Sequence, residues 1–284
     1  MKRLLLQLDS DRHPSSFDRI VAHDAGVDAV LSYGNVSPAD VTPLVHGCVF
    51  TRGVPELKHT AIWIGGSQVE AGEALTQAVL GAFFGPFRVS VMMDSNGCNT
   101  TAAAAVARLT SAADVSGARA VILGGTGPVG LRAAALLARQ GASVTITSRS
   151  IEKARDAAAR LQARFGVMVA ATEAKDDAGV ARALEGAQLC LTAGAAGVQL
   201  LPRSVWESNP TLRLMGDVNA VPPLGIEGTD AADKGVEREG KHVFGAIAIG
   251  GLKMKVHKAG VARLFERGDS VLELEAIWSI AKAL

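Results

Sequence analysis

The chain has 284 residues, of which 48% are hydrophobic and 20% are charged; this composition excludes an intrinsically disordered protein and fits one large or two ordinary α/β domains. Lys and Arg number 29 against 28 Asp and Glu, which leaves a net charge of +1, and aromatic residues make up only 4%. We therefore expect no nucleic-acid partner, and because no apolar run reaches spanning length we expect no membrane partner.

Cysteine and histidine spacing does not indicate a disulfide framework or a metal site. Cys48, Cys98 and Cys190 stand far apart, and the six histidines are scattered. No metal is therefore predicted. The first residues carry too short an apolar stretch for a signal peptide, and an odd number of cysteines suits a reducing compartment. We expect a cytoplasmic protein.

The first third of the chain alternates short apolar runs with helical patterns, which predicts parallel βα units. Strands are predicted over residues 4–8, 29–33, 47–50, 60–64 and 88–93, and helices over 14–25, 38–45 and 69–84. A turn at 94–97 follows, after which Asn99 is placed to cap a long Ala-rich helix over 100–113.

After residue 114 the strands become almost wholly apolar, as buried parallel strands are. Strands are predicted over 120–123, 143–147, 167–171, 189–192 and 212–215, with helices between them that include 131–140 and 151–165. Two closing helices are predicted over 257–267 and 271–284, joined at Gly268.

A glycine-rich turn joins the strand at 120–123 to the helix that follows it. Gly125, Gly127 and Gly130 match the pattern GxGxxG, with Thr126, Pro128 and Val129 between them. Gly125 allows the tight turn, Gly127 lets a pyrophosphate approach the backbone, and Gly130 lets helix and strand pack closely. The helix N-terminus supplies free N–H groups for phosphates. The pattern predicts a dinucleotide site; the alternative is a glycine-rich turn without a ligand.

The end of the next strand indicates which dinucleotide. A site that prefers NAD needs a carboxylate about 20 residues after the glycines, but this chain has Thr147 to Ser150 there. Ser148 and Arg149 suit a 2′-phosphate, so we predict NADP. Arg149 has the alternative of being a solvated residue at a strand end, and Glu152 is interpreted as a first-turn helix acid.

Two later strand ends belong to the same predicted crevice, because ligands of open parallel sheets bind outside the carboxyl ends of the strands. Ala193 and Gly194 follow one strand, where the cofactor ribose and nicotinamide are expected. Asn219 follows another and is assigned to the cofactor as well, although Asp217 and Asn219 have the alternative of a turn-capping pair.

These patterns together predict an α/β fold with two α/β domains and a cleft between them. The N-terminal domain spans 1–113 and a Rossmann-type dinucleotide-binding domain spans 114–249. The closing segment 250–284 is expected to return to the first domain or to bridge both.

Several stretches outside the glycine-rich turn are distinctive. They are Ser32–Val36, Phe83–Ser90, Met93–Gly97, Asn99–Ala104, Asn219–Gly225 and Ile249–Lys253. With the turn at 125–130, they closely resemble the NADP-dependent methylene-tetrahydromethanopterin dehydrogenases of methylotrophic bacteria, which also accept methylene-tetrahydrofolate. The likeness covers nearly the whole chain.

The resemblance implies a homo-oligomer of two-domain subunits that hold the pterin in the cleft. Its reaction would be reversible hydride transfer from the methylene carbon to NADP, which leaves a methenyl cation and needs no proton transfer. The family's substrate-contacting positions fall on Asp18, Asn99, Thr100, Thr101 and Lys253, and we assign Asp18 and Lys253 to the catalytic machinery. The alternatives are a helix-surface acid for Asp18, an N-terminal helix residue for Thr100 and a solvated lysine for Lys253.

Other classes of protein fit the residues less well. A bifunctional methylene-tetrahydrofolate dehydrogenase/cyclohydrolase needs a Tyr-x-x-x-Lys pair, whereas Tyr33 is followed by Ser37. A shikimate-type dehydrogenase needs a Lys/Asp pair in its N-terminal domain, and the surroundings of Lys58 do not match it. An NADP sensor without activity would not need a second α/β domain. The residues leave open whether tetrahydromethanopterin or tetrahydrofolate is the carrier.

Overall fold

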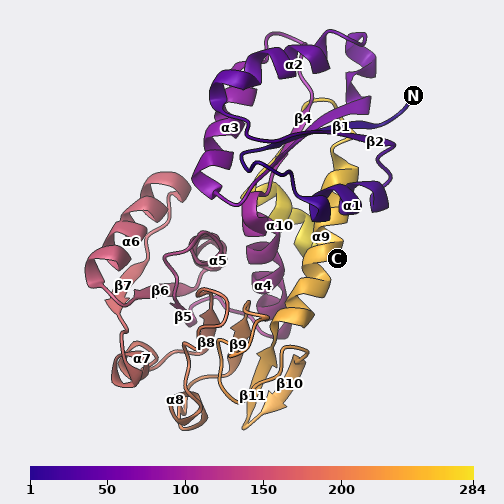
Figure 1. The fold of residues 1–284 in the computed structure, drawn as a ribbon. Coiled ribbons are helices and arrows are strands. Elements are labelled where there is room, and N and C mark those ends of the chain that lie inside the picture. Colours follow the sequence, from indigo (N-terminus) through magenta and orange to yellow (C-terminus); the bar gives the residue numbers. More distant parts are fainter. The chain divides into compact units, whose positions relative to one another are not determined.

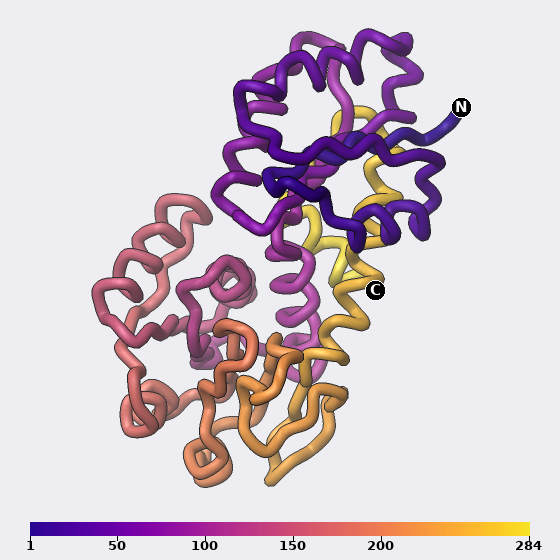
Figure 2. The backbone as a smooth tube through the Cα atoms, viewed as in Figure 1, coloured from indigo at the N-terminus to yellow at the C-terminus, as the bar shows by residue number.

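A computed structural model describes residues 1–284 and divides them into two compact units. The first unit contains Met1–Thr100 together with Met254–Leu284, and the second contains Thr101–Lys253. Figure 2 shows that the C-terminal segment, drawn in yellow, lies with the indigo N-terminal part of the chain. Each unit is built on a mainly parallel sheet with helices, so the predicted α/β class is confirmed.

The first unit is a five-stranded parallel sheet (Figure 1). Its order is β12 (Val271–Leu272), β4 (Ser90–Met93), β3 (Thr60–Gly65), β1 (Leu4–Asp9) and β2 (Ala29–Tyr33). Strands β3 and β4 are buried along their whole length, which is why they read as continuous apolar runs in the sequence. The edge strand β2 is only partly buried.

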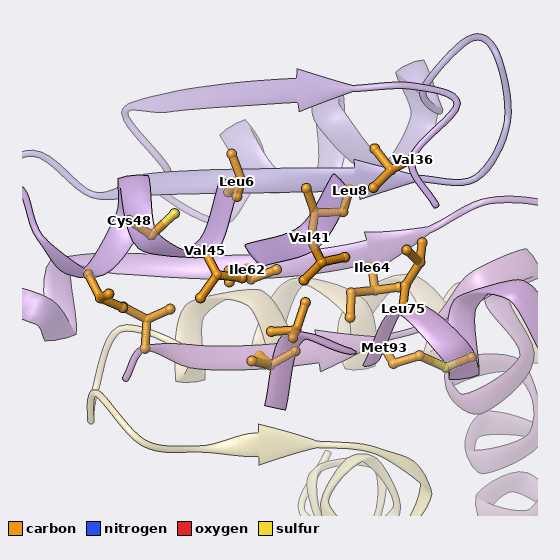
Figure 3. Packing of buried hydrophobic residues seen from close by; sticks show 14 of the residues in the cluster. Leu6, Leu8, Val36, Val41, Val45, Cys48, Ile62, Ile64, Leu75 and Met93 are labelled. Carbon is orange, nitrogen blue, oxygen red and sulfur yellow. The ribbon is translucent and has the colours of Figure 1, made fainter. Parts of the chain in front are cut away.

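Helices cover both faces of this sheet. On one face, α2 (Val41–Val49) and α3 (Val69–Gly81) pack against side chains that alternate along the strands, and Figure 3 shows Val41 and Val45 against Ile62 and Ile64. The other face receives the part of α9 (Ala246–Arg263) that starts at Met254, where a β-carbon on Gly260 would lie 2.9 Å from the Met92 sulfur. Helices α1 (Ser16–Asp24) and α10 (Leu274–Lys282) complete the unit with 3₁₀ turns at Pro38–Asp40, Val54–His59 and Ser95–Gly97.

One expectation for this unit is wrong, and two expected helices have other bounds. Residues 47–49 form the last turn of α2, with Phe50 as its C-cap, and not a strand, because Val41, Val45, Cys48 and Val49 recur at helical spacing and are all buried on one face. The helix expected over 257–267 is confirmed for 257–263, which end the longer α9, and 264–267 lie beyond its end. The helix expected over 271–284 begins only at Leu274 as α10, because Val271 and Leu272 form β12, which pairs with β4.

The second unit is a seven-stranded sheet. Its order is β10 (Lys234–Arg238), β11 (Lys241–Phe244), β9 (Leu214–Asp217), β8 (Leu189–Thr192), β5 (Arg119–Leu123), β6 (Ser143–Ser148) and β7 (Ala170–Glu173). All neighbours are parallel except β10 and β11, a hairpin that the sequence analysis missed. Its two turn residues, Glu239 and Gly240, both have positive φ, and Glu is an unusual choice at such a position.

Helices of the second unit are α4 (Cys98–Ala112), whose first residues belong to the first unit, α5 (Pro128–Arg139), α6 (Ile151–Phe165), α7 (Asp177–Ala183) and α8 (Arg203–Glu207). The cap expected from Asn99 is wrong, because α4 already begins at Cys98. The Asp94 carboxylate accepts the N–H groups of Asn99 and Thr100 at 2.8 and 2.9 Å.

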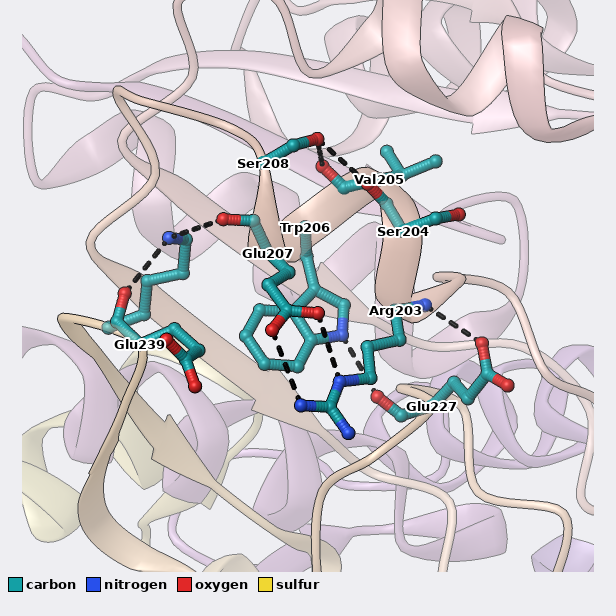
Figure 4. Close-up of polar contacts among 9 residues, drawn as sticks. Arg203, Ser204, Val205, Trp206, Glu207, Ser208, Glu227 and Glu239 are labelled. Carbon is teal, nitrogen blue, oxygen red and sulfur yellow. Dashed lines mark hydrogen bonds and ion pairs between the residues drawn. The ribbon is translucent and has the colours of Figure 1, made fainter.

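Polar contacts hold the short helix α8 to the loops around it (Figure 4). The buried indole N–H of Trp206 donates to the carbonyl of Glu227 at 2.9 Å, and the backbone N–H of Arg203 donates to the Glu227 carboxylate at 2.8 Å. Arg203 also pairs with Glu207 one turn along the helix. A helix this short is marginal by itself, so these contacts and the burial of Trp206 keep it in place.

The three cysteines are buried thiols. Burial raises the pKa of the Cys48 thiol to about 11 and raises the pKa of the Cys190 thiol further. Because the thiolate is the reactive form, we expect almost no modification of the native protein by a thiol reagent at mildly alkaline pH and modification of all three cysteines after denaturation. Mass spectrometry after alkylation measures this, and rapid labelling of the native chain would contradict it.

No helix of this structure combines the length and the apolar character needed to cross a membrane.

Candidate functional site

The glycine-rich turn leaves an open helix N-terminus at the carboxyl end of β5. Helix α5 starts at Pro128 with Gly127 as its N-cap, and no side chain caps it. The first intrahelical bond comes from Leu131 to the Gly127 carbonyl, so the N–H groups of Val129 and Gly130 point out of the helix end without a helical acceptor. This is the arrangement that binds phosphate groups at helix N-termini.

The glycines stand where other atoms of the chain, or a ligand, can come close to the backbone. A β-carbon on Gly130 would lie 2.7 Å from the α-carbon of Gly125, so no larger residue fits where α5 crosses the turn. A β-carbon on Gly127 would have only the Ala193 carbonyl oxygen nearby, at 3.9 Å. Gly130 is therefore needed for packing, whereas Gly127 faces open space where a ligand can approach the backbone.

The carboxyl end of β6 lies beside this turn. The Thr147 hydroxyl accepts the Gly124 N–H at 3.3 Å, and the Thr147 carbonyl accepts the Gly125 N–H at 3.1 Å. Ser148 follows half-buried and Arg149 follows exposed. A hydroxyl and a free guanidinium thus stand next to the turn, with no carboxylate at residues 147–150, which fits a 2′-phosphate on a bound ribose.

The loops after β8 and β9 meet the same turn. A β-carbon on Gly124 would lie 3.0 Å from the α-carbon of Gly194, so the two loops are in direct contact. The Asn219 Oδ1 accepts the N–H groups of Gly197 and Val221, and its Nδ2 donates to the Pro223 carbonyl. The structure therefore brings all the residues assigned to the cofactor to one edge of one sheet, with the Asn219 side chain occupied in holding the loops together.

Asp217 is the centre of that loop structure, and its side chain is only 1% exposed. Its Oδ1 accepts the Thr192 hydroxyl at 2.7 Å and the Asn219 N–H at 2.9 Å, and its Oδ2 accepts the Gly225 N–H at 2.8 Å. The turn-capping alternative that the sequence left open describes this geometry for Asp217 and Asn219.

In the first unit, polar groups gather around Gly65 at the carboxyl end of β3. A β-carbon on Gly65 would lie 3.1 Å from Asp9 Oδ2, 3.2 Å from Trp63 Nε1 and 3.5 Å from Asp18 Oδ2. The buried indole N–H of Trp63 has no acceptor among the atoms of the chain. Burial raises the pKa of Asp9 even though its carboxylate accepts the N–H groups of Asp11 and Ser15.

The side chain of Asp18 turns toward the sheet. Ser15 caps α1 by accepting the Asp18 N–H, and the Asp18 side chain is 16% exposed, with its Oδ1 4.0 Å from Nε2 of His257. The His257 ring is fully buried and stacks on Trp63, with the ring centroids 4.5 Å apart and the planes 6° from parallel. Asp18 is therefore more than a solvated acid on a helix surface.

The other residues assigned to the substrate lie in α4 and α9. Thr100 is buried, and its hydroxyl donates to Asp94 at 2.5 Å, while the Asn99 amide donates to the Met93 carbonyl at 2.7 Å. Thr101 and Lys253 are both partly exposed. No group of three or more His, Cys, Asp or Glu side chains is placed to hold a metal ion.

Three polar residues of the first unit escaped the sequence analysis: Asp9, Asp94 and His257. Asp9 and Asp94 stand directly at the carboxyl ends of β1 and β4, and an acid in that position of a parallel strand was a usable signal. His257 had no such signal, because its neighbour Trp63 is far away in the sequence.

The fold and the glycine-rich turn together define the chain as an α/β protein with a Rossmann-type dinucleotide-binding unit. Solved structures with the same fold include a shikimate 5-dehydrogenase from Mycobacterium fortuitum, with a TM-score of 0.55 at 18% identity, covering 99% of this chain and 98% of that one. Quinate dehydrogenase from Corynebacterium glutamicum, solved in complex with NAD, gives a TM-score of 0.53 at 15% identity, covering 100% and 99%.

Closer relatives identify the family. The "Bifunctional protein MdtA" of Methylorubrum extorquens is 50% identical over 285 residues, which cover 100% of this chain and 99% of that protein. The "NAD(P)-dependent methylenetetrahydromethanopterin dehydrogenase" of the same organism is 35% identical over 261 residues, which cover 89% and 88%. A family model described as "Methylene-tetrahydromethanopterin dehydrogenase, N-terminal" matches residues 16–96. The chain belongs to the methylene-tetrahydromethanopterin dehydrogenase family, which confirms the resemblance seen in the sequence.

Proposed function

We propose that this chain is an oxidoreductase that transfers a hydride reversibly between methylene-tetrahydromethanopterin and NADP. The observation that carries the proposal is the 50% identity to a family member along the whole chain, together with an uncapped helix N-terminus at the glycine-rich turn. Methylene-tetrahydrofolate, which presents the same kind of reacting carbon, is proposed as a second carrier.

NADP held at this turn would supply the acceptor for the hydride of the methylene carbon. The backbone N–H groups of Val129 and Gly130 would bind the pyrophosphate, and Ser148 and Arg149 would bind the 2′-phosphate. Ala193 and Gly194 would lie along the ribose and the nicotinamide, where their small size leaves room. The chain's task in this reaction is to hold the two reacting carbons in contact, which needs no general base.

We propose that the carrier is contacted by Asp18, Asn99, Thr100, Thr101 and Lys253. The side chains of Asn99 and Thr100 already donate to Met93 and Asp94, so their part is to shape the backbone at the start of α4. Asp18 and Lys253 offer charged groups to the polar pterin. Homo-oligomeric assembly and a cytoplasmic location stay predictions.

Turnover tests the reaction directly. Purified protein is mixed with methylene-tetrahydromethanopterin or methylene-tetrahydrofolate and with NADP or NAD, and the near-ultraviolet absorbance of the reduced cofactor is recorded. We expect turnover with NADP and methylene-tetrahydromethanopterin. Absence of turnover with both carriers, in a protein that still binds NADP, would contradict the proposed substrate and favour another NADP-dependent dehydrogenase.

The Lys253→Met variant tests the role of that lysine. Because the change removes a positioning contact and leaves the redox chemistry to the cofactor, we expect kcat/KM for the pterin to fall about tenfold, mainly through KM, with the Kd for NADP unchanged. Lys255→Met, an exposed neighbour on α9, is the matched control. An unchanged kcat/KM in Lys253→Met would contradict the substrate contact proposed for Lys253.

A further inference from the structure

The start of α6 combines a helix N-terminus with the residues that would receive a 2′-phosphate. Ser150 is the N-cap of this helix, and its hydroxyl oxygen accepts the Lys153 N–H at 3.3 Å. Ser148 and Arg149 immediately precede it at the end of β6. The free N–H groups and partial positive charge of the helix end add to the attraction of Arg149 for an anion here.

The chain already places an anion of its own at this point. The Glu152 carboxylate accepts the Ser150 hydroxyl proton at 2.6 Å, and this bond, followed by the N–H of Glu152 itself, lowers the pKa of the Glu152 carboxyl. Arg155 lowers the pKa further. Glu152 is therefore ionised at neutral pH, and its charge lies at the same helix end that faces the Arg149 segment.

A bound 2′-phosphate and this carboxylate would compete for the same donors. The Ser150 hydroxyl has one proton and can donate it to only one acceptor. When a 2′-phosphate takes that proton, the Glu152 carboxylate loses its strongest hydrogen bond and stands close to a second negative group. NAD carries a hydroxyl in place of the 2′-phosphate, so it neither repels the carboxylate nor requires the Ser150 proton.

We propose that Glu152 is a specificity-determining residue that opposes Arg149 and reduces the preference for 2′-phosphorylated nucleotides. The proposal rests on the dinucleotide site of the proposed function. Arg149 attracts the 2′-phosphate, Glu152 repels it, and the ratio of affinities for NADP and NAD reflects both. Removing the charge of Glu152 therefore increases the preference for NADP without touching the glycine-rich turn.

Nucleotide affinities of variants test this proposal. Calorimetric titration of the full chain with NADP and with NAD gives Kd values for the wild type, Glu152→Gln and Asp156→Asn. Asp156 is an exposed acid one turn further along α6, so its replacement removes the same charge from the same helix without changing Ser150. We expect Glu152→Gln to tighten NADP binding about fivefold at low salt, with less gain at high salt, and to leave NAD binding unchanged.

The outcomes separate this proposal from the proposed function. A wild type that binds neither nucleotide would contradict the dinucleotide site and the role of Glu152 with it. If both nucleotides bind, an unchanged NADP affinity in Glu152→Gln, or an equal gain for NADP and NAD, overturns the specificity role alone. An equal gain for NADP in Asp156→Asn overturns it as well, because the effect would then be one of net charge.

Discussion

The Asp217→Ala variant is expected to lose about 3–5 kcal/mol of unfolding free energy. Its buried carboxylate accepts hydrogen bonds from the Thr192 hydroxyl and from the N–H groups of Asn219 and Gly225. Alanine leaves the two N–H groups without an acceptor where water has little access, and each such donor costs about 1–3 kcal/mol. The Thr192 hydroxyl keeps only its 3.4 Å contact with the Gly216 carbonyl. The loops after β8 and β9 should loosen as well, which weakens nucleotide binding.

Urea denaturation followed by far-ultraviolet circular dichroism measures the loss. The matched control is Asp177→Ala, which removes an exposed acid in the first turn of α7 and should change the unfolding free energy by less than about 0.5 kcal/mol. A loss below about 1 kcal/mol in Asp217→Ala would mean that other groups or water satisfy the same donors, and that Asp217 is not the element that holds these loops.

The Arg149→Ala variant is expected to bind NADP about 10–100-fold more weakly while its affinity for NAD stays nearly the same. A charge-assisted bond between a guanidinium and a phosphate contributes about 1.5–3 kcal/mol, and only the 2′-phosphate of NADP can form it here. Because Arg149 is exposed, the loss should be smaller at high salt.

Binding of both nucleotides by calorimetry gives the two Kd values directly. Arg160→Ala, which removes an exposed arginine from the same helix α6, controls for the general loss of positive charge. Equal weakening of NADP and NAD in Arg149→Ala would show that Arg149 contacts the shared part of the nucleotides. No weakening of either would make it a solvated residue at the end of β6.

The cofactor half of the candidate site was predictable because its determinants are local. The turn at 125–130 lies between an apolar strand and a helix. Neighbouring atoms leave little room for a side chain at Gly125 and Gly130, and Gly127 faces open space. The segment 147–150 ends the next parallel strand, so topology alone places it beside the turn. The same reasoning correctly placed Ala193, Gly194 and Asn219 at that edge.

The half of the site in the first unit depended on contacts between distant segments. Asp18 is a first-turn helix acid by its sequence, and only the folded unit turns it toward His257 and Trp63. The contact of Asp94 with Thr100 is local by comparison, because the carboxylate accepts the hydroxyl and the N–H of a residue six positions along the chain, together with the Asn99 N–H. The residue pattern of one segment does not show which side chains of another segment will contact it in the folded chain.

The sequence by itself determined the α/β class, the dinucleotide turn and the family, because strand and helix periods, glycine positions and long matching stretches are properties of contiguous residues. The tertiary structure decided which secondary structure the ambiguous segments adopt. Residues 47–50 are apolar enough for a strand, but burial of Cys48 and Val49 on one face of α2 makes 47–49 helical, with Phe50 as the C-cap. Residues 271–272 pair as β12 because β4 offers an open edge. In both cases the free energy that favours the observed secondary structure comes from contacts with residues that are distant in the sequence.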